Sequence, residues 1–156
     1  MEIAPISQIK KELASLPPEE LGNLVLRLAK FKKENKELLS YLLFEAFDEQ
    51  EYIKQAKDEI NLDFLSLNRS SYYLAKKTLR KSLRTTNKYI RFSGKKETEI
   101  ELLLHFCRKM KESKLSYKGN RVVFNMYINQ VKRIQKVITQ LHEDLQYDYQ
   151  EALEAL

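Results

Sequence analysis

Hydrophobic residues recur every three or four positions along most of the chain, which is the spacing that places them on one face of an α-helix. This periodicity predicts about seven helical segments, at about residues 5–16, 17–31, 34–47, 48–64, 68–93, 96–113 and 120–156. The connections between them are short, so consecutive helices are expected to be antiparallel neighbours. We predict an all-α fold of stacked helical hairpins, either an irregular bundle or a short solenoid-like superhelix, in a single domain over residues 1–156.

The ends of these segments carry residues that favour helix boundaries. Pro18 suits a first helical turn, where a missing N–H leaves no hydrogen bond unmade. Asp48, Asn68 and Asn120 are predicted N-caps, and Glu51 completes a capping box with Asp48. Gly94 is expected to end the fifth helix in the left-handed conformation that glycine adopts without strain.

The third segment is apolar around most of its circumference. It contains leucine and phenylalanine on several sides: Leu38, Leu39, Leu42, Leu43, Phe44 and Phe47. A helix of this kind is usually central and covered on all sides. We therefore expect residues 34–47 to form a buried helix.

The last segment has the most regular pattern. Its apolar residues alternate between steps of three and four: Phe124, Tyr127, Val131, Ile134, Ile138, Leu141 and Leu145. Such a heptad stripe is typical of a two-stranded coiled coil, but Ile128 and Val137 widen it beyond a coiled-coil seam. Packing against preceding helices of the same chain, and hence a monomer, is the favoured interpretation. A homodimer through residues 124–145 is the alternative.

The amino-acid composition limits the possible fold classes and cellular locations. Only 3 Gly and 3 Pro occur in 156 residues, which is too few for the tight turns of a β or doubly wound α/β fold. No apolar run reaches the length of a membrane span, and the N-terminus lacks the pattern of a signal peptide. The single cysteine, Cys107, excludes an intrachain disulfide. We expect a soluble, cytoplasmic protein with no membrane association.

The histidine, cysteine and acidic residues do not occur at the spacings that catalysis or metal binding requires. A di-iron site in a helical bundle requires paired Glu-x-x-His motifs, but Leu102 and Thr139 precede His105 and His142 by three positions. We interpret His105 as a histidine at the edge of the core. Cys107, in an apolar row, is interpreted as buried and inert. No glycine-rich phosphate loop is present. We therefore predict no enzymatic activity, no cofactor and no metal.

Charge is distributed unevenly. The formal net charge is +6, yet residues 64–96 contain ten Lys and Arg and no acid, so the rest of the chain is net negative. Five of these cations recur at helical spacing and form what we call the basic ridge: Lys77, Arg80, Arg84, Lys88 and Arg91. We predict that the basic ridge is a binding surface.

Three interpretations of this ridge remain open. It is a solvated face or pairs within the chain, with the acidic residues of segment 48–64 or of the acidic tail 143–156. Alternatively it binds an acidic protein partner. The third possibility is that it binds nucleic-acid phosphates, with Tyr73, Tyr89 and Phe92 stacking on bases if they are exposed. The leading hypothesis is a non-catalytic protein-interaction or scaffold module. The alternative is a nucleic-acid-binding protein that contacts phosphates through residues 69–96.

Several stretches are similar to an uncharacterised bacterial family of all-helical proteins, known only as a domain of unknown function. They are residues 9–13, 16–21 and 75–90 and the run 101–107, with sequence ELLLHFC. The resemblance extends over most of the chain and implies an α-helical, repeat-like fold. It implies no activity, cofactor or catalytic residue.

Overall fold

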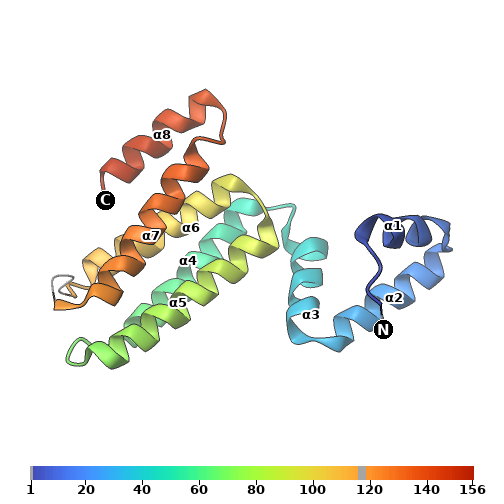
Figure 1. Cartoon of the computed structure of the whole chain (residues 1–156), viewed down its shortest axis with the longest axis horizontal. Coiled ribbons are helices and arrows are strands. Elements are labelled where there is room, and N and C mark those ends of the chain that lie inside the picture. The colour runs from blue at the N-terminus through green and yellow to red at the C-terminus, as the bar shows by residue number, and fades with distance from the viewer. Residues whose placement is uncertain (1, 116–118) are drawn as a thin grey trace. The chain divides into compact units, whose positions relative to one another are not determined.

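The computed structural model describes residues 2–115 and 119–156, and within these ranges the chain is helical with no strand (Figure 1). The all-α prediction is confirmed. Its elements are α1 (Ile6–Ser15), α2 (Pro18–Phe31), α3 (Lys33–Ser40), the π-helical turn η1 (Tyr41–Glu45), α4 (Glu49–Leu65), α5 (Tyr72–Ser93), α6 (Lys96–Glu112), α7 (Arg121–Ile138) and α8 (Glu143–Glu154). The chain forms two compact units, Met1–Phe44 and Glu45–Leu156.

The second unit is a helical bundle whose hairpins surround α6. Helix α6 packs against α4, α5, α7 and α8, while α4 also packs against α5, and α7 against α8 (Figure 1). Three consecutive leucines from Leu102 to Leu104 are buried, so α6 is covered on almost every side. The remaining buried residues of α6 are Thr98, Ile100, Phe106, Cys107 and Met110. This helix, rather than segment 34–47, is the central one.

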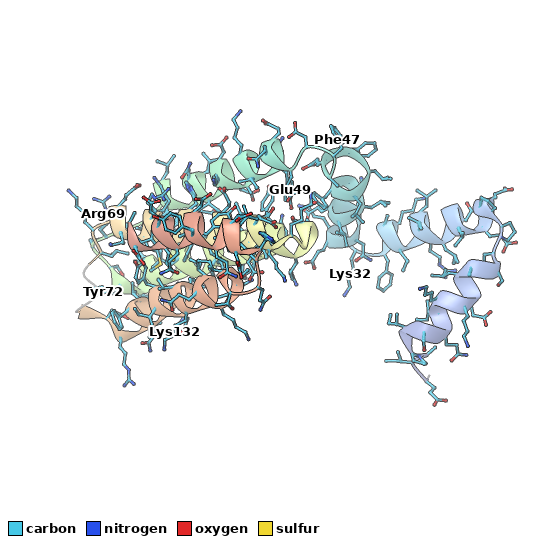
Figure 2. All side chains as sticks on the ribbon, turned by 90° about the horizontal axis from the view of Figure 1, so that it is seen from above. Lys32, Phe47, Glu49, Arg69, Tyr72 and Lys132 are labelled. Carbon is cyan, nitrogen blue, oxygen red and sulfur yellow. The ribbon has the colours of Figure 1, made fainter. Side chains whose placement is uncertain are left out.

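The first unit contrasts with that bundle. Among the residues that the structure describes, helices α1, α2 and α3 contain no buried residue. The expectation that segment 34–47 is buried is therefore wrong: Phe44 and Phe47 are mostly exposed, and the regular α-helix ends at Ser40. Figure 2 shows the side chains of α1 and α2 projecting outward around each helix. A helix that is apolar on every side is stable only when other helices pack around it, and its own sequence does not determine whether such helices are present.

Most of the predicted helix boundaries are confirmed. Pro18 occupies the first turn of α2, and the Asp48 carboxylate accepts a hydrogen bond from Glu51 N at 3.1 Å. Gly94 ends α5 with φ +68°, and its N–H donates to the carbonyl of Ile90. Asn120 caps α7 through Val122 N at 3.1 Å.

Two boundaries differ from the prediction. Asn68 does not cap α5; its side-chain oxygen instead accepts from Ser70 N at 2.9 Å in a local turn, and Ser71 is the N-cap. The final segment is broken into α7 and α8, so the heptad stripe does not lie on one continuous helix. His142 Nδ1 caps α8, where Glu143 in the first turn suits the positive end of the helix dipole.

The predicted apolar stripe is buried in part. Ile134 and Ile138 are buried where α7 contacts α6 and α8, whereas Phe124 and Leu145 are exposed. In the part of the chain that the structure describes, each helix is too short or too polar to cross a bilayer.

Candidate binding surface on helix α5

Helix α5 presents three distinct sides, which follow from its repeat of 3.6 residues per turn. Its core side buries Ala75, Leu79, Ser82, Thr86 and Ile90. The basic ridge lies on the opposite side, because its members are offset from these residues by about half a turn. Arg80, Arg84 and Arg91 are exposed, as the amphipathic pattern predicts.

A third side of α5 faces α4 and contacts the carboxylates of Asp63 and Glu59. Lys81 Nζ lies 2.6 Å from Asp63 Oδ1, and Thr85 donates to Asp63 Oδ2 at 3.1 Å. One turn further on, the hydroxyl of Tyr89 donates to the Glu59 carboxylate. We call this row of contacts the α4–α5 polar seam.

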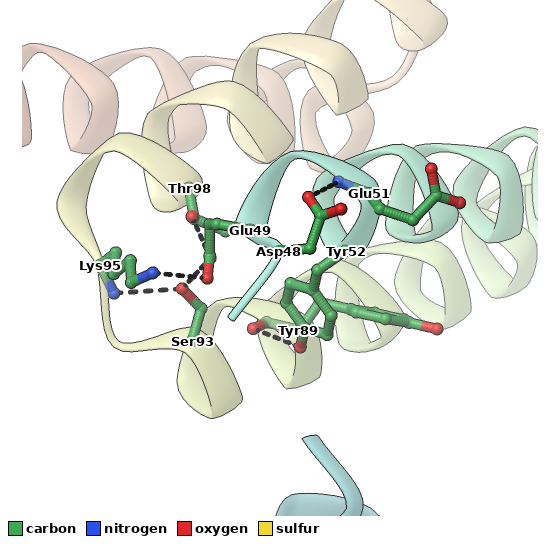
Figure 3. Close-up of polar contacts among 8 residues, drawn as sticks. All are labelled: Asp48, Glu49, Glu51, Tyr52, Tyr89, Ser93, Lys95 and Thr98. Atoms are coloured by element: carbon green, nitrogen blue, oxygen red, sulfur yellow. Dashed lines mark hydrogen bonds and ion pairs between the residues drawn. The ribbon is translucent and has the colours of Figure 1, made fainter. Parts of the chain in front are cut away.

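Tyr52 joins the same seam from α4. Its hydroxyl donates to the backbone carbonyl of Tyr89 at 3.0 Å, and the two rings lie 5.3 Å apart between centroids in a tilted arrangement (Figure 3). Tyr52 is buried, so its hydroxyl needs this partner in place of water. The contact fixes Tyr89 against α4 rather than leaving its ring free to bind a ligand.

The seam ends at Glu49, where the α5–α6 turn meets the first turn of α4 (Figure 3). Thr98 donates to Glu49 Oε1 at 2.5 Å, and the Ser93 hydroxyl donates to the same oxygen. Lys95 Nζ lies 2.9 Å from Glu49 Oε2. Glu49 therefore holds residues from both sides of the turn, while its negative charge also suits the N-terminus of α4.

Three cations of the basic ridge take no part in the α4–α5 polar seam. Among the described residues, Lys77, Arg80 and Arg84 are exposed and have no ion pair. Lys88 is half-buried, with Nζ 5.5 Å from the centroid of the Tyr89 ring. A surface hollow of about 570 Å³ adjoins the ridge and is lined by Lys81, Arg84, Thr85, Asn87, Lys88 and Arg91. Repeated cations around one hollow form a site that attracts anions.

The three aromatic side chains considered for base stacking have different surroundings. Tyr73 is 75% exposed and therefore accessible. Tyr89 is engaged by Tyr52 and Glu59, and Phe92 is half-buried. One accessible ring is a weak platform, because binding of single strands uses successive aromatic side chains.

His105 and Cys107 occupy the positions predicted for them. His105 Nε2 lies 2.8 Å from Asn61 Oδ1 at the edge of the core, and burial, together with Lys57 and other nearby cations, lowers the pKa of His105 to about 4. Cys107 is fully buried, and this burial raises the pKa of its thiol to about 12. The neutral thiol is a poor nucleophile and metal ligand. Within the described residues, no three His, Cys, Asp or Glu side chains form a group able to hold a metal ion.

Arg133 makes a contact that the sequence pattern did not indicate. From α7, its Nε lies 2.6 Å from Glu99 Oε1, and a terminal guanidinium nitrogen donates to Asn87 Oδ1 at 2.6 Å. It therefore links α7 to α6 and to α5 beside the ridge. The three residues are far apart in sequence, so no local spacing signals their meeting.

Comparison with known proteins gives no match: no family model, no curated protein and no solved structure is detectably similar to the chain.

Proposed function

We propose that the chain is a non-catalytic helical protein-interaction module that binds an acidic segment of a partner protein through the basic ridge. The observation that carries the proposal is the orientation of α5: Asp63 and Glu59 contact its α4 side, and Glu49 binds Ser93 at its end. The ridge cations Lys77, Arg80 and Arg84 remain exposed on the side opposite the core.

The spacing of the ridge suits an elongated acidic ligand. Residues 77 to 91 span four turns of helix, or about 20 Å, with a cation about every 5 Å along the axis. A partner helix or extended strand with repeated Asp or Glu can place several carboxylates along such an array. Each exposed pair contributes little, so the affinity depends on several pairs acting together and weakens as salt increases.

An acidic protein is favoured over a single-stranded nucleic acid by the surroundings of the aromatic side chains. The ring of Tyr89 is held by the α4–α5 polar seam, and Phe92 is half-buried, so Tyr73 alone of the three is well exposed. Binding of single strands combines phosphate contacts with several stacking rings. A cationic ridge without that platform is poorly suited to single strands. Double-stranded nucleic acid, whose phosphates need no stacking, is the competing ligand that the test includes.

The test compares labelled polyglutamate with single- and double-stranded oligonucleotides of equal charge, using fluorescence anisotropy at low and moderate salt. We expect salt-dependent binding that favours polyglutamate. Simultaneous K77E, R80E and R84E substitutions should weaken it by tenfold or more, or about 1.4 kcal/mol. The matched control K111E, K132E and K136E changes the net charge equally at exposed lysines elsewhere in the second unit.

Three results would contradict the proposal. Absence of polyglutamate binding at low salt would show that the basic ridge does not bind acidic chains. Equal weakening by the two triple variants shows that net charge acts, rather than the ridge. Tighter binding of an oligonucleotide than of polyglutamate assigns the ridge to nucleic acid.

A further inference from the structure

The first unit exposes large apolar side chains along α1, α2 and η1. On α1 and α2 they recur at helical spacing, and none is buried among the residues that the structure describes. Its most exposed members include Ile6 at 79% and Phe31 at 76%. The other large apolar residues exposed in α1, α2 and η1 are Ile9, Leu13, Leu24, Val25, Leu26, Leu28, Leu42, Leu43 and Phe44.

Helices α2 and α3 enclose an apolar groove. It has a volume of about 400 Å³, and its walls come from both helices and the start of η1: Val25, Leu28, Ala29, Asn35, Leu38, Leu39 and Leu42. Asn35 is its single polar lining residue, and its side chain donates to the carbonyl of Leu28 at 2.8 Å. That hydrogen bond joins α3 to α2 and leaves the leucines to line an open hollow.

A unit of this size needs additional stabilisation. The unit is Met1–Phe44, and chains near this length usually require a disulfide, a metal or oligomerisation to fold stably. Its sequence contains no cysteine and no histidine. Packing against a second copy of the chain would cover its apolar side chains.

We propose that the first unit is a self-association surface, on which the apolar groove and stripes of α1 to α3 pack against those of a second copy of the chain. Charge favours this pairing. Residues 1–44 contain seven Lys and Arg and six Asp and Glu, whereas residues 45–156 contain 21 and 16. Two nearly neutral surfaces associate with little repulsion, and the basic ridge lies outside them.

The exposed apolar surface is large enough for a stable dimer. Burying one large apolar side chain removes roughly 100 Å² from water. With eleven such residues about half exposed, the unit offers on the order of 600 Å². A standard interface buries about 800 Å² per partner, of which a little over half is apolar, so about three quarters of this surface must be buried on pairing.

The surface differs from the stripe over residues 124–145 that the sequence suggested for a homodimer. In that stripe Ile134 and Ile138 are already buried within the second unit. Pairing through them requires α7 to leave α6, whereas pairing through the first unit displaces no buried side chain of α1 to α3.

Sedimentation equilibrium of the full chain over a range of concentrations tests the proposal. We expect the wild type to reach twice the monomer mass of 18.6 kDa. L28E, in the groove, should weaken association at least tenfold. L62E is the matched control, because Leu28 is 61% exposed in the first unit and Leu62 is 65% exposed in the second. A wild type that remains monomeric, or equal weakening by the two variants, overturns the proposal.

A second measurement does not depend on folding of L28E. Asn23 on α2 is exposed, so an N23C variant accepts donor and acceptor dyes, while the buried Cys107 resists labelling. Mixed donor- and acceptor-labelled copies should show energy transfer that decreases on dilution or on addition of unlabelled chain. Dyes at K132C, on α7, should show less. Absence of transfer at N23C, or stronger transfer at K132C, contradicts the assignment of the interface to the first unit.

Discussion

Helices α2 and α5 have equally strong amphipathic patterns, but their apolar sides have opposite environments. Helix α5 buries five residues against its neighbours, whereas α2 buries none among the described residues. The difference arises from the number of helices available to pack: α5 meets α4 and α6, while α2 has its main contact with α3 alone. Periodicity therefore specifies which side of a helix must be covered, and the neighbouring helices determine whether it is.

The largest expected difference between the two units comes from removing one phenylalanine ring from each. Phe106 is fully buried and packs edge-on against Phe64 at 5.7 Å between centroids. F106A should lower the free energy of unfolding of the second unit by about 3–5 kcal/mol through lost burial and a residual cavity. F31A, in the first unit, should leave unfolding of the second unit within about 0.5 kcal/mol of wild type. Chemical denaturation measures both, and equal effects would contradict the division into units.

Glutamates in the first turns of α4 and α2 provide a second comparison. Glu49 is bound by Ser93, Thr98 and Lys95, so E49A removes three partners in addition to the interaction with the helix dipole. We expect a loss of about 2–3 kcal/mol, and a smaller loss for E49Q. E19A, on exposed α2, removes mainly the dipole contribution and should cost less than about 1 kcal/mol. Thermal unfolding distinguishes them; similar shifts would show that the Glu49 contacts add little.

Lowering the pH should reduce the stability of the second unit, which contains both histidines of the sequence. The pKa of His105 is about 4 in the folded chain and about 6.5 when unfolded, so the unfolded chain binds the extra proton between these values. Stability is therefore fully present above pH 6.5 and is lost as the pH falls towards 4. After allowance for partial exposure, wild type should lose about 1–2 kcal/mol more than H105Q over this range. H142Q, at an exposed histidine, is the control in the same denaturation series.

The smallest expected effect on the free energy of unfolding is a gain rather than a loss. Among the described residues the buried hydroxyl of Ser82 has no hydrogen-bond partner. S82A removes this unsatisfied group from the core side of α5, so we expect stability unchanged or raised by up to about 1 kcal/mol. S15A, at an exposed hydroxyl at the end of α1, should not raise stability. Destabilisation by S82A would indicate that the hydroxyl has a partner.

Local sequence signals predicted the local features of this fold. Asp48, Gly94 and Asn120 act within three or four residues of the chain, and each caps its helix as expected. The prediction that Asn68 caps α5 was wrong because Asn can also hydrogen-bond within a turn, as it does with Ser70. The break before α8 was signalled by the acidic pair after His142, but the regular apolar stripe indicated one continuous helix.

Features that depend on packing were harder to predict. The side of α5 that carries the ridge followed from helical spacing. Whether acids of segment 48–64 would neutralise that ridge depended on the angle between α4 and α5, which no spacing specifies. The same applies to Arg133, which joins Glu99 and Asn87 from three different helices.

The burial of Cys107 gives the chain an internal reporter. Its thiol is the only one in the sequence. It lies on α6, is buried in the core of the bundle and has a raised pKa. A thiol reagent therefore reacts when the bundle opens, so the reaction rate measures how often opening occurs under native conditions. Each substitution in the second unit can be assessed in this way without adding a probe.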